Sequence, residues 1–184
     1  MGRIVVAMMV SLDGYVEGAN GSQDWHDVDE PLHLAMNELA AGADALVYGR
    51  KVYEVMIPYW PEAAVDSSRP AFEQEFGRLF IEKPKLVFTH GTPSPAPNVE
   101  VFADDFSELA RRREASSGYL LSFGGPTLID QLLAAGLVDE ICSHVNPVVL
   151  GSGRALICRR TPLRHIETKP FPNGVVRMRH EVIR

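Results

Sequence analysis

Hydrophobic residues are arranged in two alternating patterns along this chain. Short, almost continuous apolar runs predict buried strands at residues 3–10, 45–48, 85–89, 99–102, 119–123 and 138–145. Stretches with apolar residues at helical spacing separate these runs, at 30–41, 50–56, Ser68 onward, 105–115 and 126–135. The alternation of strand and helix predicts an α/β fold with a mostly parallel sheet.

Residues typical of helix ends and of loops support this division into strands and helices. Pro31 suits the first turn of the helix at 30–41, and Gly42 stands where a helix commonly ends. Ser68 is a suitable N-cap for the helix that follows it. The polar and glycine-rich or proline-rich stretches 15–28 and 57–69 are predicted to be loops.

The C-terminal part has a different pattern. Segments 163–169 and 175–183 flank Asn173-Gly174, a pair that favours a tight hairpin turn. Apolar and charged residues alternate along 175–183, which is typical of a half-exposed antiparallel strand. With no internal repeat and no composition break, residues 1–184 are predicted to form a single domain.

Composition narrows the functional class. The 184 residues are 46% hydrophobic, which is enough for a full core, and no apolar run is long enough to span a membrane. The net charge of −6 argues against nucleic acid as the main partner. Cys142 and Cys158 form no CxxC pair, and the histidines show no metal-ligand spacing. We therefore expect a reduced, cytoplasmic protein without a metal or a membrane anchor.

A Gly-Gly turn is the most informative motif. Gly124 and Gly125 follow an apolar strand and open the helix at Pro126, so the amides of Thr127 and Leu128 lack helical partners and suit a phosphate. A tight turn without any ligand is the alternative. The later Gly151-Ser152-Gly153 lacks a third glycine and a following βαβ unit, which excludes a Rossmann site.

Five motifs together resemble the dihydrofolate reductase-like superfamily. They read SLDGY, GRKVYE, GGPTL, GLVDE and PVVLGSG, at residues 11–15, 49–54, 124–128, 136–140 and 147–153. Within that superfamily the chain resembles the riboflavin-biosynthesis reductase domain, which is the C-terminal domain of the bifunctional deaminase-reductase, and its stand-alone bacterial relatives. The resemblance implies a three-layer sandwich with a mostly parallel central sheet and a C-terminal antiparallel hairpin.

The same resemblance implies an activity. Members of this family bind NADPH across the carboxyl ends of the strands and transfer a hydride to a small pteridine-, pyrimidine- or flavin-precursor-like heterocycle. They are expected to form homodimers through the C-terminal strands, here 175–183. The alternative is a catalytically silent NADP(H)-binding sensor or assembly protein on the same fold.

The resemblance also assigns a cofactor site. It would consist of Gly49, Arg50, Lys51, Val52, Thr89, His90, Gly124, Gly125, Thr127 and Leu128.

Within that site, Arg50 is expected at the adenosine ribose phosphate, and the amides of Lys51 and Val52 at the diphosphate. Val52 stands where the family often has a threonine. Thr89 and His90 end a strand near the expected 2′-phosphate. A surface salt bridge for Arg50 and strand-end capping for Thr89 and His90 are the alternatives.

The catalytic groups are the least defined. Asp13 follows the first strand, so it is our candidate for orienting substrate or relaying a proton, with a turn-forming Asp-Gly as the alternative. In dihydrofolate reductases a substrate-binding acid lies about sixteen residues before the Gly-Arg pair, and an ungapped count reaches His33. Trp25, Tyr59 and Trp60 are expected to flank the cleft. They would stack on a flat ring, plug loops onto the core or make a dimer contact.

Overall fold

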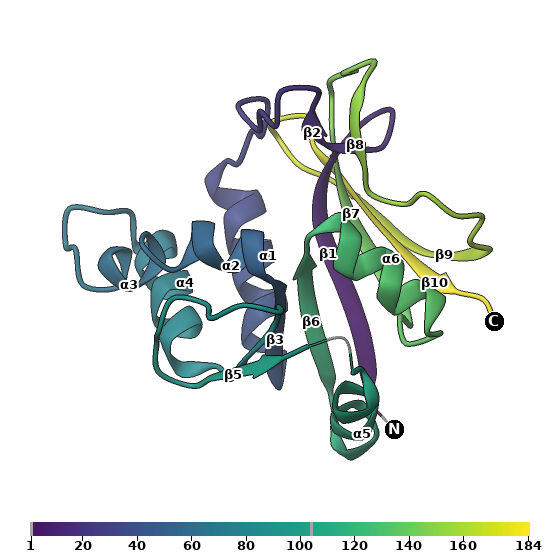
Figure 1. The fold of residues 1–184 in the computed structure, drawn as a ribbon. Helices are drawn as coiled ribbons and strands as arrows, with labels where there is room; N and C mark the ends of the chain where they lie inside the picture. The colour runs from purple at the N-terminus through teal and green to yellow at the C-terminus, as the bar shows by residue number, and fades with distance from the viewer. Residues whose placement is uncertain (1, 104) are drawn as a thin grey trace.

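The computed structural model describes residues 2–103 and 105–184, and its centre is an eight-stranded sheet (Figure 1). The strands of this sheet are β1 (Arg3–Ser11), β3 (Ala45–Gly49), β4 (Lys85–Phe88), β5 (Val99–Phe102), β6 (Tyr119–Gly124), β7 (Glu140–Asn146), β9 (Leu163–Pro170) and β10 (Val176–Val182). A separate pair consists of β2 (Tyr15–Gly18) and β8 (Gly153–Ala155). The helices are α1 (Glu30–Ala41), α2 (Arg50–Met56), α3 (Trp60–Ala63), α4 (Ala71–Glu82), α5 (Ser107–Ala115) and α6 (Pro126–Ala134).

The strand order is β5-β4-β3-β6-β1-β7-β10-β9. The first six strands pair in parallel, whereas β10 pairs antiparallel with both β7 and β9. The predicted fold class is therefore confirmed, including the C-terminal antiparallel hairpin. The turn of that hairpin is closed by the Gly174 N–H donating to the Phe171 carbonyl at 3.0 Å.

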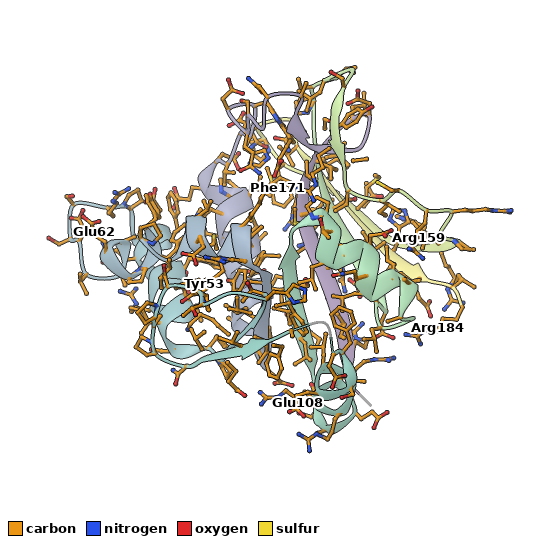
Figure 2. All side chains as sticks on the ribbon, in the orientation of Figure 1. Tyr53, Glu62, Glu108, Arg159, Phe171 and Arg184 are labelled. Atoms are coloured by element: carbon orange, nitrogen blue, oxygen red, sulfur yellow. The ribbon has the colours of Figure 1, made fainter. Side chains whose placement is uncertain are left out.

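Helices cover both faces of the sheet, because alternate residues of its strands point to opposite sides. Ile4 and Val6 of β1 belong to the core cluster that includes α5 and α6. Val5 and Ala7 belong to the cluster that includes α1, α2 and α4. Figure 1 shows the same division, with α1, α2 and α4 on one side of the sheet and α5 and α6 on the other. Figure 2 shows Tyr53 among the side chains on the side of α1, α2 and α4, whereas Glu62 and Arg159 lie at the periphery of the molecule.

This division fixes where a ligand can bind. β3 leads into α2 on one face, and its neighbour β6 leads into α6 on the opposite face. At such a switch point the two connections diverge and leave a crevice at the carboxyl ends of the strands. Gly49 lies at this edge. Gly124 and Gly125, which are joined to each other by a cis peptide bond, lie there too.

An ionic cluster holds the hairpin onto the parallel strands. Glu140, at the start of β7, is 1% exposed and accepts hydrogen bonds from Arg179 at 2.6 Å and from Arg3 at 3.2 Å. Arg179 comes from β10 and Arg3 from β1, so one buried carboxylate connects three adjacent strands. Removing one partner of such a buried charge is far more costly than removing an exposed one.

Three local predictions were wrong. The segment 57–69 contains the short helix α3, and the segment 15–28 contains β2. The helix predicted to start at Ser68 begins at Ala71 with Pro70 as N-cap, because the Ser68 hydroxyl instead donates to the Asp66 carboxylate at 2.6 Å. Each error concerns an element of four residues or a helix end, where sequence periodicity carries little information.

Candidate functional site

A cavity of about 320 Å³ opens at the switch point between β3 and β6. It is bounded by the ends of β3 and β4, the first turns of α2 and α6, and the β2–β8 pair. We call it the basic cavity. Nine of the ten residues predicted to bind cofactor line it: Gly49, Arg50, Lys51, Val52, Thr89, His90, Gly125, Thr127 and Leu128.

The tenth predicted residue, Gly124, lies directly behind this wall. A Cβ atom added to Gly49 would stand 3.3 Å from both the Gly124 carbonyl oxygen and the Gly125 nitrogen. The two strand ends thus approach more closely than most side chains permit. Glycine at position 49 allows the two turns to form one continuous wall.

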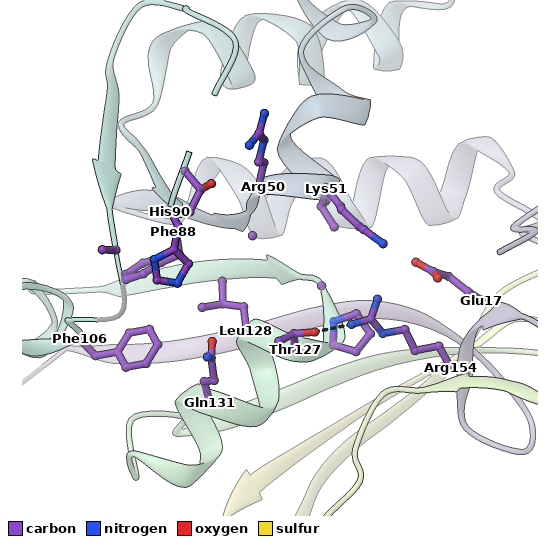
Figure 3. A pocket seen from close by; sticks show the side chains of 16 residues that line it. Glu17, Arg50, Lys51, Phe88, His90, Phe106, Thr127, Leu128, Gln131 and Arg154 are labelled. Carbon is purple, nitrogen blue, oxygen red and sulfur yellow. Dashed lines mark hydrogen bonds between the residues drawn. The ribbon is translucent and has the colours of Figure 1, made fainter. Parts of the chain in front are cut away.

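The charge of the basic cavity is opposite in sign to that of the whole chain. Arg50, Lys51 and Arg154 line it together with a single carboxylate, that of Glu17. Figure 3 shows these side chains around the cavity, with Arg154 donating a hydrogen bond to the Thr127 hydroxyl. A local excess of cations in a chain of net charge −6 favours an anionic ligand at this place.

The start of α6 adds backbone donors to this wall. Its N-cap, Gly125, offers no side-chain hydrogen bond, and Pro126 has no N–H. The first intrahelical bond runs from the Ile129 N–H to the Gly125 carbonyl at 3.1 Å. The N–H groups of Thr127 and Leu128 therefore have no partner within the helix and are available to a ligand oxygen.

The opposite side of the basic cavity is aromatic. Phe88 and Phe106 line it, with ring centroids 5.1 Å apart. Phe88 also stacks on Phe102 at 5.5 Å, which fixes its ring. Thr89 and His90 follow Phe88 at the end of β4, so a flat apolar surface lies next to polar side chains. A ligand with both a heterocyclic ring and phosphates matches this combination.

A second, larger cavity of about 690 Å³ adjoins the first, and we call it the histidine cavity. Glu17, Arg50, Lys51 and Val52 line both cavities, so the two meet at the start of α2. The remaining lining is mostly apolar and aromatic. It consists of Ala7, Met8, Met9, Gly21, Gln23, His26, His33, Met36, Glu54, Val55, Met56, Trp60, Phe76, Phe123 and His144.

The three histidines of this cavity come from different elements. His33 lies on α1, His144 on β7, and His26 in the segment between β2 and α1. Burial lowers the pKa of each of them, and that of His144, which is 1% exposed, falls to about 4. All three imidazoles are therefore mainly neutral at pH 7.

His33 is the residue that an ungapped count back from Gly49-Arg50 places at the substrate-binding acid of dihydrofolate reductases. It lies in the wall of the histidine cavity and packs against Phe72 at 4.8 Å and Trp60 at 5.8 Å between ring centroids. The position where dihydrofolate reductases are expected to carry an acid thus carries a neutral imidazole in this chain. Glu73 and Glu75 act electrostatically on this imidazole, but neither carboxylate lines the cavity.

Asp13 is not brought to either cavity. Its carboxylate accepts hydrogen bonds from the Ser11 hydroxyl at 2.7 Å and from the backbone N–H groups of Leu150 and Gly151 at 3.1 and 2.8 Å. The Ser11 hydroxyl is the main reason why the pKa of Asp13 is lowered, and the two N–H groups add to it. The carboxylate thus ties the loop after β1 to the loop after β7, and its catalytic role stays a prediction.

Of the aromatic candidates Trp25, Tyr59 and Trp60, only Trp60 lines one of the two cavities described above. The Tyr59 hydroxyl donates to Glu73 at 2.7 Å, and the Trp25 indole N–H donates to the Ser22 carbonyl at 3.3 Å. The side chains of Tyr59 and Trp25 thus form hydrogen bonds with neighbouring residues.

In the part of the chain that the structure describes, no group of three or more acidic, histidine or cysteine side chains is placed to hold a metal ion. No helix within residues 2–103 and 105–184 is long and apolar enough to cross a membrane.

Sequence reasoning missed several lining residues. Glu17 and Arg154 face each other across the β2–β8 pair, and two strands this short leave no periodic signal. His144 lies within an apolar run, where it reads as an ordinary core residue. The lining phenylalanines Phe88 and Phe106 likewise read as core positions until the fold brings them together.

Comparison with known proteins agrees with this geometry. The chain belongs to the RibD C-terminal domain family, which it matches over residues 3–177. It is 31% identical over 183 residues to the uncharacterized protein YyaP of Bacillus subtilis (strain 168), covering 96% of this chain and 93% of that protein. A second protein of that organism, the uncharacterized protein YwjB, is 27% identical over 182 residues, which cover 94% of this chain and 94% of that protein.

Solved structures share the fold. A putative riboflavin biosynthesis protein from Shewanella sp. PV-4 superposes with a TM-score of 0.70 at 21% identity, with both chains fully covered. A dihydrofolate reductase from Enterococcus faecalis, complexed with NADP(H), superposes with a TM-score of 0.62 at 17% identity over 98% of this chain and 95% of that one. The resemblance noted from the sequence motifs is therefore confirmed at the level of family and fold.

The buried histidine predicts how stability depends on pH. Because the pKa of His144 is about 4 in the folded protein and that of a free histidine is near 6.5, the unfolded chain binds more protons between these values. The contribution of this neutral imidazole to the free energy of unfolding is fully present above about pH 6.5 and is lost as the pH falls toward 4. At pH 5 the loss from this residue is about 2 kcal/mol.

The His144→Asn variant should therefore lose less stability than the natural protein when urea unfolding is compared at pH 7 and pH 5. Leu132→Ala is the matched control, because it destabilises the core without removing a titratable group. It should lower the free energy of unfolding by the same amount at both pH values. An unchanged pH dependence in His144→Asn would show that this imidazole is not held neutral.

Proposed function

We propose that this chain is an NADPH-dependent reductase that transfers a hydride to a small, flat heterocycle. The observation that carries the proposal is the convergence of two adjoining cavities on the start of α2. One cavity is cationic and rich in backbone donors, and the other is apolar and large enough for a ring compound. Membership of the RibD C-terminal domain family supports a reductase of this kind.

The residues of the basic cavity fit the cofactor. The free N–H groups of Thr127 and Leu128 suit the diphosphate, with Arg154 fixed beside them by its bond to Thr127. Arg50, Thr89 and His90 suit a 2′-phosphate on the adenosine ribose, and Phe88 offers a face to the adenine. When bound, NADPH supplies the hydride.

The residues of the histidine cavity would orient the substrate. Trp60, Phe76 and Phe123 present aromatic surface to a flat ring, and methionines fill the space between them. This apolar lining excludes water from the place where the ring would lie. Holding the ring in one orientation is the contribution that the protein itself makes to the transfer.

Turnover tests the proposal directly. Loss of NADPH absorbance would be followed with a panel of pterins, pyrimidines, flavin precursors and quinones. Oxidation that depends on both the protein and one class of ring supports a reductase. Tight NADPH binding without turnover across the panel would instead favour the catalytically silent binding protein.

Arg50→Gln should weaken use of NADPH. We expect the KM for NADPH to rise roughly tenfold, because a charge-assisted contact with phosphate is lost, whereas the KM for NADH should change little. Arg159→Gln is the matched control, since Arg159 pairs with Asp130 at 2.7 Å and lines neither cavity. Equal affinities of the natural protein for NADH and NADPH would contradict the assignment of the 2′-phosphate.

Asp13→Asn separates a structural role from a catalytic one. A general acid or base typically contributes about a hundredfold or more to the rate, whereas a residue that only ties two loops together contributes less. Because its carboxylate is bound to the loop at 150–151, we expect kcat of Asp13→Asn to fall by less than about tenfold. A loss of a hundredfold with an unchanged melting temperature would make Asp13 the proton relay.

We further propose that the protein is a cytoplasmic homodimer formed through its C-terminal strands. The strand expected to make the contact, 175–183, contains β10, which is paired on both sides with β7 and β9. The edge of the sheet is therefore β9, whose Leu163 and Ile166 are 41% and 47% exposed. A long edge strand with exposed apolar residues invites pairing with another chain. Light scattering should give twice the mass of one chain, and Ile166→Lys should give a monomer. A monomeric natural protein would refute the dimer.

A further inference from the structure

The inner half of the histidine cavity carries no formal charge. The elements that form it are β1, β6, β7, α1 and α4, and they contribute apolar side chains together with His33 and His144. Both imidazoles are mainly neutral at pH 7 because they are buried. Trp60 and Phe76 complete this surface, and no carboxylate, lysine or arginine lines it. Glu73 and Glu75 act electrostatically on His33, and Arg177 acts on His144, but none of these three residues lines the cavity.

Three of the four charged residues of the cavity lie at its junction with the basic cavity. Glu17, Arg50 and Lys51 line both cavities. The fourth, Glu54, is on α2 and already accepts hydrogen bonds from the Ser94 N–H at 3.0 Å and the Ser94 hydroxyl at 2.5 Å. It also pairs with Arg50 at 3.8 Å. The cations at the junction are therefore shared with the cofactor side or with a neighbouring acid.

A charged ligand group would lose its hydration in the inner half without gaining a partner of opposite charge among the side chains that line it. Burying an unpaired charge costs far more than burying a neutral polar group, so the wall selects against both cations and anions. Neutral imidazoles still accept or donate single hydrogen bonds to carbonyl and N–H groups of a ring. The four methionines Met8, Met9, Met36 and Met56 adapt to apolar outlines of different shape.

We propose that the substrate of this chain is an uncharged, flat ring compound that carries no phosphate group. The inference rests on the proposed function, since it concerns the cavity next to the cofactor. It also separates this chain from a reductase that would recognise a phosphorylated or protonated ring. His33 is the residue that most directly sets this preference, because it places an imidazole in the inner wall on α1.

Riboflavin and flavin mononucleotide form a matched pair of probes, because they share one ring system and differ in a phosphate. NADP⁺ binding is first measured by calorimetry, which tests the proposed function by itself. Flavin fluorescence quenching is then titrated with NADP⁺ at saturation, so that the basic cavity is filled. Riboflavin should bind at least about tenfold more tightly than flavin mononucleotide.

Equal binding of the two flavins, tighter binding of flavin mononucleotide, or binding of neither would overturn the inference. A protein that fails to bind NADP⁺ but prefers riboflavin loses the proposed function and keeps the preference for an uncharged ring. The two failures are therefore distinguishable.

A charge placed in the inner wall gives a second readout. His33→Asp should bind the cationic dye proflavine about tenfold more tightly than the natural protein, because it supplies the missing counter-charge. Leu34→Asp is the matched control, since the neighbouring Leu34 is 40% exposed and lines neither cavity. Unchanged proflavine binding in a folded His33→Asp protein would overturn the inference. If that variant does not fold, the flavin comparison on the natural protein decides alone.

Discussion

The divergence of β3 and β6 is the constraint on which the rest of this structure depends. These neighbouring parallel strands end side by side, yet their following helices lie on opposite faces of the sheet. The backbones at Gly49 and at Gly124 and Gly125 must approach closely for this to occur. The resulting crevice brings the first turns of α2 and α6 to one place, and both cavities open from it.

The two cavities differ in how they treat charge. The basic cavity gathers cations and free backbone donors in a chain whose net charge is negative, so its attraction for an anion is local. The charged residues that line the histidine cavity lie at the junction or on α2, and its inner half is lined with apolar side chains and neutral imidazoles. A cofactor with several phosphates and a ring without charge would be sorted to opposite ends of one cleft by this arrangement.

Much of the fold could be predicted from the sequence, because its strands are buried on both faces and form continuous apolar runs. The basic cavity could also be predicted in large part, since glycines at strand ends mark the turns that form its wall. The family resemblance supplied Arg50 and the pair Thr89 and His90, which spacing alone does not identify. Nine of the ten residues that were predicted to bind the cofactor line the basic cavity.

The remaining residues depend on contacts between distant segments. Glu17 and Arg154 meet only because β2 and β8 pair, and both strands are too short to show a period. His144 is surrounded by apolar residues in the sequence, so its place beside a cavity follows from the position of β7 next to β1. Asp13 stood out because it follows a strand, but the loop at 150–151 binds its carboxylate.

A crystal structure with bound NADP⁺ would show whether the switch point between β3 and β6 is a cofactor site. We expect the diphosphate at the N–H groups of Thr127 and Leu128 and the 2′-phosphate next to Arg50. The nicotinamide should point past Lys51 into the histidine cavity. A dinucleotide bound elsewhere on the molecule, or with its nicotinamide turned away from that cavity, would contradict this expectation.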